Sequence, residues 1–259
     1  MNQQGVAKVV SSRIAISRTV LASVEVHGAD VAKELSEILF PQGVPPTLTV
    51  PGLITALHGA LSGAMEAMAV ADVAHAQELS DDEAPRLARE SGIAALRAQM
   101  IGLRSTFSSV YGTGILGAYG LAGETPDDPE ALLQRVASTA QLLKSRPITE
   151  TPRQIGITID APALGDALFA TASELRAALA DVRREEREAQ ITLGRRDEAV
   201  AVWNKRYQGV ADVITGIYEL VGRTDLADRV RPTARRRAGL TEEADTTPAP
   251  TPPTPANPV

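Results

Sequence analysis

Apolar residues recur every three or four positions along this chain, in long rows. The clearest row is Trp203, Tyr207, Val210, Ile214, Ile217 and Val221. This spacing puts the six side chains on one narrow face of a helix, which a second helix must cover. The same stepping recurs over residues 54–71 and 93–110. We therefore predict an all-α fold, a bundle of about six long antiparallel helices arranged as hairpins.

Prolines and capping residues place the helix boundaries. We predict helices over 11–39, 51–79, 80–110 and 129–145, and a fifth that begins after Asp160. Ser80 and Glu83 fit a capping box, so the second and third helices should form an antiparallel hairpin. The fifth helix either turns near Gly194 or continues as one rod. Residues 155–159 alternate like a short strand, which we expect to lie across the bundle.

Three regions follow from these boundaries. We expect a flexible N-terminus over residues 1–10 and one helical bundle domain over 11–237. Residues 238–259 are acidic and rich in Thr, Pro and Ala without apolar periodicity, so we predict a disordered tail. The charged run at 181–188 is typical of a solvated helix face.

Composition narrows the functional classes. The chain has 259 residues and no cysteine, which excludes disulfides, thiol nucleophiles and thiolate metal sites. Aromatic residues make up 3%, which argues against a base-stacking surface, and the net charge of −6 gives no general attraction to phosphate backbones. We find neither a signal-peptide layout nor a membrane-length apolar run. We expect a cytoplasmic protein without a nucleic-acid partner.

Few residues have the spacing that catalysis or metal binding needs. His58 and His75 are 17 residues apart, about 25 Å along one helix, so they cannot share an ion. His27 has no partner in an H-x-x-x-H or E-x-x-H pattern. No G-x-S-x-G or phosphate-binding glycine loop occurs. We expect no enzyme activity, no cofactor and no small-molecule substrate, and keep a metal-binding bundle as a third hypothesis.

Two segments have a distinctive order of residues, and they carry a resemblance. One is Tyr111-Gly112, Gly117 and Gly120-Leu121-Ala122-Gly123-Glu124-Thr125-Pro126-Asp127-Asp128-Pro129. The other comprises Trp203, Tyr207, Leu220-Val221-Gly222 and Leu226-Ala227-Asp228-Arg229-Val230-Arg231-Pro232. Over roughly residues 90–237 the chain resembles a loosely defined group of uncharacterised bacterial helical proteins. The resemblance implies a helical fold and no activity.

The remaining candidates are surfaces for a partner. The glycine-rich segment could contact a partner helix, insert into a bilayer over residues 111–123, or close a turn by internal packing. The arginines near the C-terminal end could hold an acidic partner, or fold back onto the chain. The candidate partner-contact residues are Tyr111, Gly114, Gly117, Tyr119, Arg231, Arg235, Arg236 and Arg237.

These observations favour a non-catalytic helical scaffold or assembly component that binds a protein partner or itself. A membrane-active helical protein that inserts residues 111–123 is the alternative.

Overall fold

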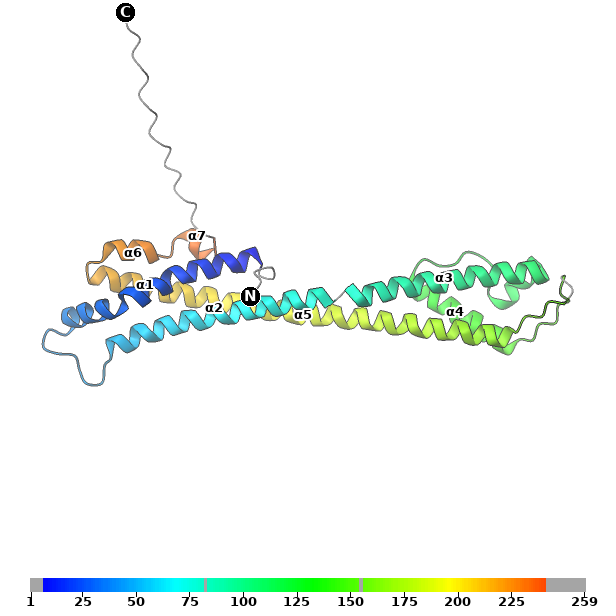
Figure 1. Cartoon of the computed structure of the whole chain (residues 1–259), viewed down its shortest axis with the longest axis horizontal. Helices are drawn as coiled ribbons and strands as arrows, with labels where there is room; N and C mark the ends of the chain where they lie inside the picture. Colours follow the sequence, from blue (N-terminus) through cyan, green and yellow to red (C-terminus); the bar gives the residue numbers. More distant parts are fainter. Residues whose placement is uncertain (1–6, 82, 154–155, 241–259) are drawn as a thin grey trace, which may run out of the picture. The chain divides into compact units, whose positions relative to one another are not determined.

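The computed structural model describes residues 7–81, 83–153 and 156–240. Over these residues the fold is all-α, as predicted, and no strand is present (Figure 1). The elements are α1 (Lys8–Leu39), α2 (Val50–Asp81), α3 (Glu83–Tyr111), the 3-10 helix η2 (Thr113–Tyr119), α4 (Pro129–Ser145), α5 (Ala161–Leu220), α6 (Thr224–Val230) and α7 (Ala234–Arg237).

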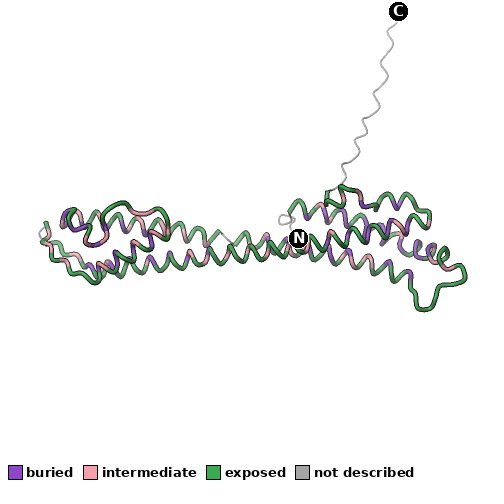
Figure 2. Tube along the Cα trace, turned by 180° about the vertical axis from the view of Figure 1, so that it is seen from behind, coloured by how far each residue is buried: buried purple, intermediate pink, exposed green. Residues whose placement is uncertain are grey.

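The chain divides into two compact units. Unit 1 comprises residues 1–76 and 192–259, and unit 2 comprises residues 77–191. Both α2 and α5 therefore contribute residues to each unit. Both units contain buried positions, which are coloured purple in Figure 2. Where one domain was expected over 11–237, two hydrophobic cores are formed by different residues.

The core of unit 1 is built on the predicted α5 row. Trp203 is fully buried and stacks on Tyr207, with 5.1 Å between ring centroids. The indole Nε1 donates a 2.8 Å hydrogen bond to Ser17 Oγ on α1. Six residues further along α1, Ser23 Oγ lies 2.9 Å from the Tyr218 hydroxyl. Hydrogen bonds thus satisfy polar atoms that α1 and α5 bury against each other.

A side chain from α2 fixes the beginning of α1. The carboxylate of Asp72, which is buried, accepts a 2.7 Å hydrogen bond from the backbone N–H of Ala7, the residue before the helix. Negative charge at a helix N-terminus is stabilising. The helix therefore begins at Lys8 and already buries Val10, so residues 8–10 of the expected flexible N-terminus are helical. Residues 1–6 lie outside the described part.

Unit 2 packs α3, η2, α4 and the first half of α5. The α3 row is confirmed: Leu96, Met100, Leu103, Phe107 and Val110 are buried. The predicted start of α4 is confirmed too, since Asp128 Oδ2 accepts a 2.8 Å hydrogen bond from the N–H of Ala131. Asp160 caps α5 in the same way, accepting from Ala163 N–H at 3.1 Å.

The predicted capping box at Ser80 and Glu83 is wrong. Ser80 does not cap a helix start, because it lies inside α2 and its hydroxyl donates to the carbonyl of Gln77 at 2.6 Å. The apolar residues of α2 are used in the core of unit 1, whereas those of α3 are used in unit 2. The two helices therefore have different packing partners.

Two further expectations are resolved. Of the two alternatives for the fifth helix, the rod is correct, because α5 continues through Gly194. The strand-like run is not a strand over its described residues 156–159, while Ile155 lies outside the described part. Of the predicted tail, residues 238–240 follow α7 and residues 241–259 lie outside the described part.

Candidate functional site

The glycine-rich segment packs mostly into unit 2. In η2, Ile115, Leu116 and Tyr119 are buried. The Tyr119 ring lies 5.4 Å from the Phe107 ring, and its hydroxyl donates to the carbonyl of Arg146 at 3.3 Å. Tyr111 is half-buried, beside the same Phe107. The aromatic side chains of this segment thus stabilise its own fold.

The glycines divide into two kinds. Gly112 and Gly120 have φ of 90° and 70°, which glycine adopts without strain, and so they form the bends around η2. Gly114 and Gly117 are exposed, and an added Cβ would meet no atom within 4 Å at either position. Of the four candidate contacts in this segment, only these two glycines lie wholly on the surface.

A surface hollow of about 590 Å³ lies next to Tyr111. It is lined otherwise by residues 143–148, 150, 152 and 157–162. Its lining carries both signs of charge, since it includes Lys144 and Arg146 as well as Glu150 and Asp160. Lys144 is already paired with Asp166 at 2.6 Å. This open, mixed hollow selects no single class of ligand.

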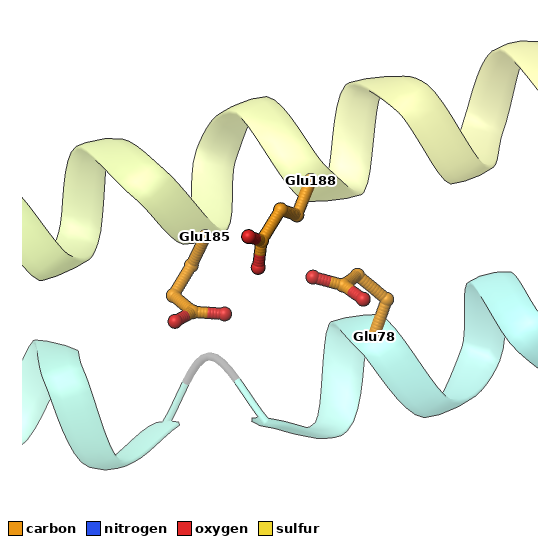
Figure 3. A group of neighbouring side chains, drawn as sticks. All are labelled: Glu78, Glu185 and Glu188. Atoms are coloured by element: carbon orange, nitrogen blue, oxygen red, sulfur yellow. The ribbon is translucent and has the colours of Figure 1, made fainter.

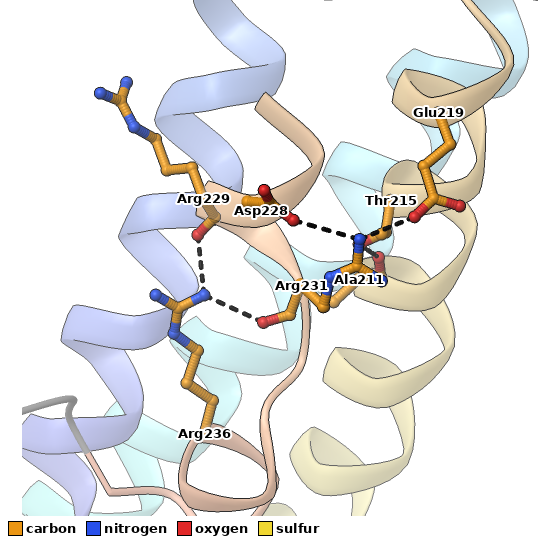
Figure 4. Close-up of polar contacts among 7 residues, drawn as sticks. All are labelled: Ala211, Thr215, Glu219, Asp228, Arg229, Arg231 and Arg236. Carbon is orange, nitrogen blue, oxygen red and sulfur yellow. Dashed lines mark hydrogen bonds and ion pairs between the residues drawn. The ribbon is translucent and has the colours of Figure 1, made fainter. Parts of the chain in front are cut away.

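The C-terminal arginines bind their own chain (Figure 4). Arg231 reaches Glu219 on α5 at 2.7 Å and Asp228 on α6 at 3.2 Å, and these carboxylates raise the pKa of its guanidinium. Arg236 donates to the carbonyls of Arg229 and Arg231 at 2.7 and 2.9 Å. It therefore satisfies carbonyl oxygens at the end of α6.

The neighbouring Arg237 adds hydrogen bonds to the chain around it. Arg237 donates to the Pro232 carbonyl and to Asp212 on α5, both at 3.0 Å. Arg235, the remaining candidate, also has an interaction partner. Three of the four candidate arginines thus link α6 and α7 to α5 or to each other within unit 1, whereas the glycine-rich segment belongs to unit 2.

The histidines lie apart, as their spacing requires. His58 Nε2 is 3.1 Å from Glu25 Oε1, and His75 Nδ1 is 3.0 Å from Thr192 Oγ1. The described residues hold one other group with metal-ligand chemistry, the carboxylates of Glu78, Glu185 and Glu188, whose oxygens lie within 4.8 Å of one another (Figure 3). Hard cations take about six to eight oxygen ligands, and Glu185 already accepts from Arg184 at 2.9 Å. Three carboxylates alone do not define a metal site.

The outward face of α2 carries little charge. Over residues 50–77 the only exposed charged side chain is Glu66, because Asp72 is buried. In contrast, α1 exposes charged side chains along its length: Lys8, Arg18, Glu25, Asp30, Lys33 and Glu37. Large apolar side chains are exposed on α2 instead, with Leu53, Val70 and Val73 at 50%, 64% and 38%. An exposed apolar face of this kind is a candidate interaction surface.

Within residues 50–111 the described part of the chain contains one stretch that is long and apolar enough to be tested as a membrane span. Its length and composition would allow a membrane crossing, but core helices of soluble proteins pass the same test.

Sequence reasoning missed this α2 face. The row used for prediction, from Ile54 to Ala71, lies on the side of the helix that is buried or half-buried. The signal on the other side was the pattern Gly59-x-x-x-Gly63-x-x-x-Ala67 within a segment almost free of charge. Small residues four apart allow close helix approach, a motif best known from membrane helices.

Comparisons with known proteins add no family assignment: no family model, curated protein or solved structure matches the chain. The resemblance to uncharacterised bacterial helical proteins stays a prediction.

Proposed function

We propose that this protein is a non-catalytic helical interaction module, an assembly component that works by presenting a helix face to another protein. The observation that carries the proposal is the outward face of α2. Its row of exposed side chains is apolar or small, while the core on the opposite side of the same helix is already filled by Ile54, Leu61 and Met68. A soluble helix normally presents charged residues there.

The alternative, insertion of residues 111–123 into a membrane, has less support. The apolar side chains that would enter the bilayer include Ile115, Leu116 and Leu121, which are buried in the core of unit 2. Insertion would have to remove them from that core first. The C-terminal arginines likewise favour an internal role, because the guanidinium groups of Arg231, Arg236 and Arg237 donate hydrogen bonds within the chain.

Site-specific photo-crosslinking in cells that make the protein tests the proposal. A photoreactive phenylalanine analogue replaces Val70 on α2, and a matched control replaces Val26 on α1, which is 70% exposed. We expect a discrete protein adduct from position 70 and none from position 26. Absence of an adduct from position 70, or equal smears from both positions, would contradict an interaction through α2.

A further inference from the structure

We infer that Arg13 on α1 is a binding site for a carboxylate, and that residues 233–240 cover this site and open to admit the ligand. We call residues 233–240 the strap; they comprise α7 and the residues on either side of it. Arg13 and the strap both belong to unit 1. Neither is part of the outward face of α2, so this site is a second function of the chain, separate from the proposed interaction face.

Arg13 carries a buried positive charge that has no counter-ion among the described residues. It is 9% exposed, and its guanidinium carbon lies 5.5 Å from the centre of the Trp203 ring. Its one described hydrogen bond runs from Nη1 to the carbonyl of Val9 at 3.2 Å, while Nε is buried without a partner. Burial lowers the pKa of this guanidinium, and no carboxylate offsets that effect. A buried charge of this kind costs stability until an opposite charge pairs with it.

The unused edge of the Arg13 guanidinium matches a carboxylate. Nε–H and Nη2 form the side-on edge of an arginine, which binds a carboxylate through two parallel hydrogen bonds. In Arg13 neither atom has a described hydrogen bond. One carboxylate would satisfy both donors and neutralise the single charge. A phosphate dianion would need a second cation, whereas the strap residues Arg236 and Arg237 already donate within the chain.

The backbone of Gly239 covers Arg13. A Cβ added at Gly239 would lie 2.7 Å from Arg13 Cζ and 2.8 Å from Nε. Its φ of 75° also favours glycine, which adopts this conformation without strain. The Gly239 N–H donates to the Arg236 carbonyl at 2.9 Å. The strap therefore lies where a ligand of Arg13 would lie, and it leaves Nε without a partner.

The strap has few contacts that would hold it closed. No side chain of α7 is buried, and Leu240 is 52% exposed. Its described links to the preceding helices are polar: Arg237 donates to Asp212 on α5, and Arg236 donates to the Arg229 carbonyl at the end of α6 (Figure 4). Segments with few buried apolar contacts open locally at low free energy. Opening the strap would uncover Arg13 without removing an apolar side chain of α7 from the core.

Reaction of Arg13 with phenylglyoxal, which modifies accessible arginines, tests the opening. Gly239→Ala opposes the closed strap through both its φ and its contact with Arg13. Gly222→Ala is the matched control, because Gly222 has φ of 76° and an added Cβ would meet nothing within 4 Å. We expect Gly239→Ala to raise the rate of modification at residue 13 at least about threefold, and Gly222→Ala to change it less than about twofold. Mass spectrometry of the peptide that contains residue 13 gives the rate.

Titration with sodium acetate, against equal concentrations of sodium chloride, tests the class of ligand. The single tryptophan, Trp203, lies beside the guanidinium, so its fluorescence reports on the site. We expect a saturable change with acetate and none with chloride. Because only the open state binds, Gly239→Ala should lower the half-saturating acetate concentration at least about threefold. Arg13→Lys, which lacks the side-on edge, should raise this concentration, and Arg13→Met should abolish the response.

Four outcomes would overturn the site. Equal rates of phenylglyoxal modification in the wild type and Gly239→Ala would show that the strap does not control access to Arg13. Loss of the far-UV circular dichroism of unit 1 in Gly239→Ala would show that the strap does not open by itself. An acetate response that matches chloride, or that persists in Arg13→Met, would refute carboxylate binding. Tighter binding of phosphate than of acetate would assign the site to another anion. None of these results depends on the crosslink at position 70.

Discussion

The two cores should unfold separately, and one substitution in each can test this. Leu96 in unit 2 and Leu61 in unit 1 are both fully buried and belong to different clusters. Replacing either leucine by alanine removes three carbon groups worth about 0.8 kcal/mol each. The cavity left behind raises the cost to roughly 3–4 kcal/mol. With a urea m-value of ~2 kcal/mol/M for one unit, the midpoint should fall by about 1.5–2 M.

The chain supplies a reporter for only one unit. Trp203 is the single tryptophan and lies fully buried in unit 1, whereas far-UV circular dichroism follows the helices of both units. Leu96→Ala should therefore lower the circular dichroism midpoint for part of the signal and leave the tryptophan fluorescence midpoint within a third of that shift. Leu61→Ala should move the fluorescence midpoint fully. If Leu96→Ala moves both signals equally, the two cores form one cooperative unit and the reasoning fails.

Three more substitutions give distinct outcomes. Ile214→Asp places a carboxylate at a position that is 1% exposed, so we expect the free energy of unfolding of unit 1 to fall by more than about 4 kcal/mol. The measurement is loss of native tryptophan fluorescence. Retention of a native melting profile would contradict burial of the α5 row that contains Ile214. Burial raises the pKa of the Tyr218 hydroxyl, so the stability that the protonated hydroxyl contributes is present below the unfolded-state pKa of about 10 and is lost as pH rises through the folded-state pKa. Tyr218→Phe should therefore reduce the loss of stability in thermal melts between about pH 9 and 11. An unchanged dependence of stability on pH would refute this prediction. Arg13 is buried against the Trp203 ring, its Nε has no hydrogen-bond partner, and its one described hydrogen bond is to the Val9 carbonyl. Arg13→Met should keep the apolar contact with Trp203 and either leave the free energy of unfolding within about 1 kcal/mol of the wild-type value or raise it. A loss above ~2 kcal/mol would mean that the charge of Arg13 is stabilising.

Local patterns predicted the helices well because each depends on neighbours in sequence. The Asp128 and Pro129 start of α4 and the α3 row to Val110 follow from capping chemistry and helical period alone. Ser80 and Glu83 misled for the same reason: a capping box is a local pattern, and α2 continues through Ser80. No local pattern indicates that α2 and α3 use their apolar residues in different cores.

The candidate site was harder to predict, because a surface is defined by what remains uncovered. The sequence identified the arginines at 231 and 235–237 as a basic cluster, but their acidic partners, such as Asp212 and Glu219, are scattered on α5. The outward side of α2 could be recognised only after Ile54, Leu61 and Met68 had been assigned to the core. Periodicity identifies the apolar face of a helix that packs into a core. The role of the opposite face can be judged only once it is known which of its residues remain exposed.

The discontinuous composition of unit 1 has a consequence for synthesis on the ribosome. Its hydrogen bonds join Ser17 to Trp203 and Ser23 to Tyr218, so α1 cannot complete its packing until the second half of α5 has been translated. The intervening ~115 residues of unit 2 take roughly 6–23 s at typical elongation rates. During that interval the buried rows of α1 and α2 lack their α5 partner, while unit 2 can already fold. Nascent chains paused after residue 191 should therefore be the species that needs protection by chaperones.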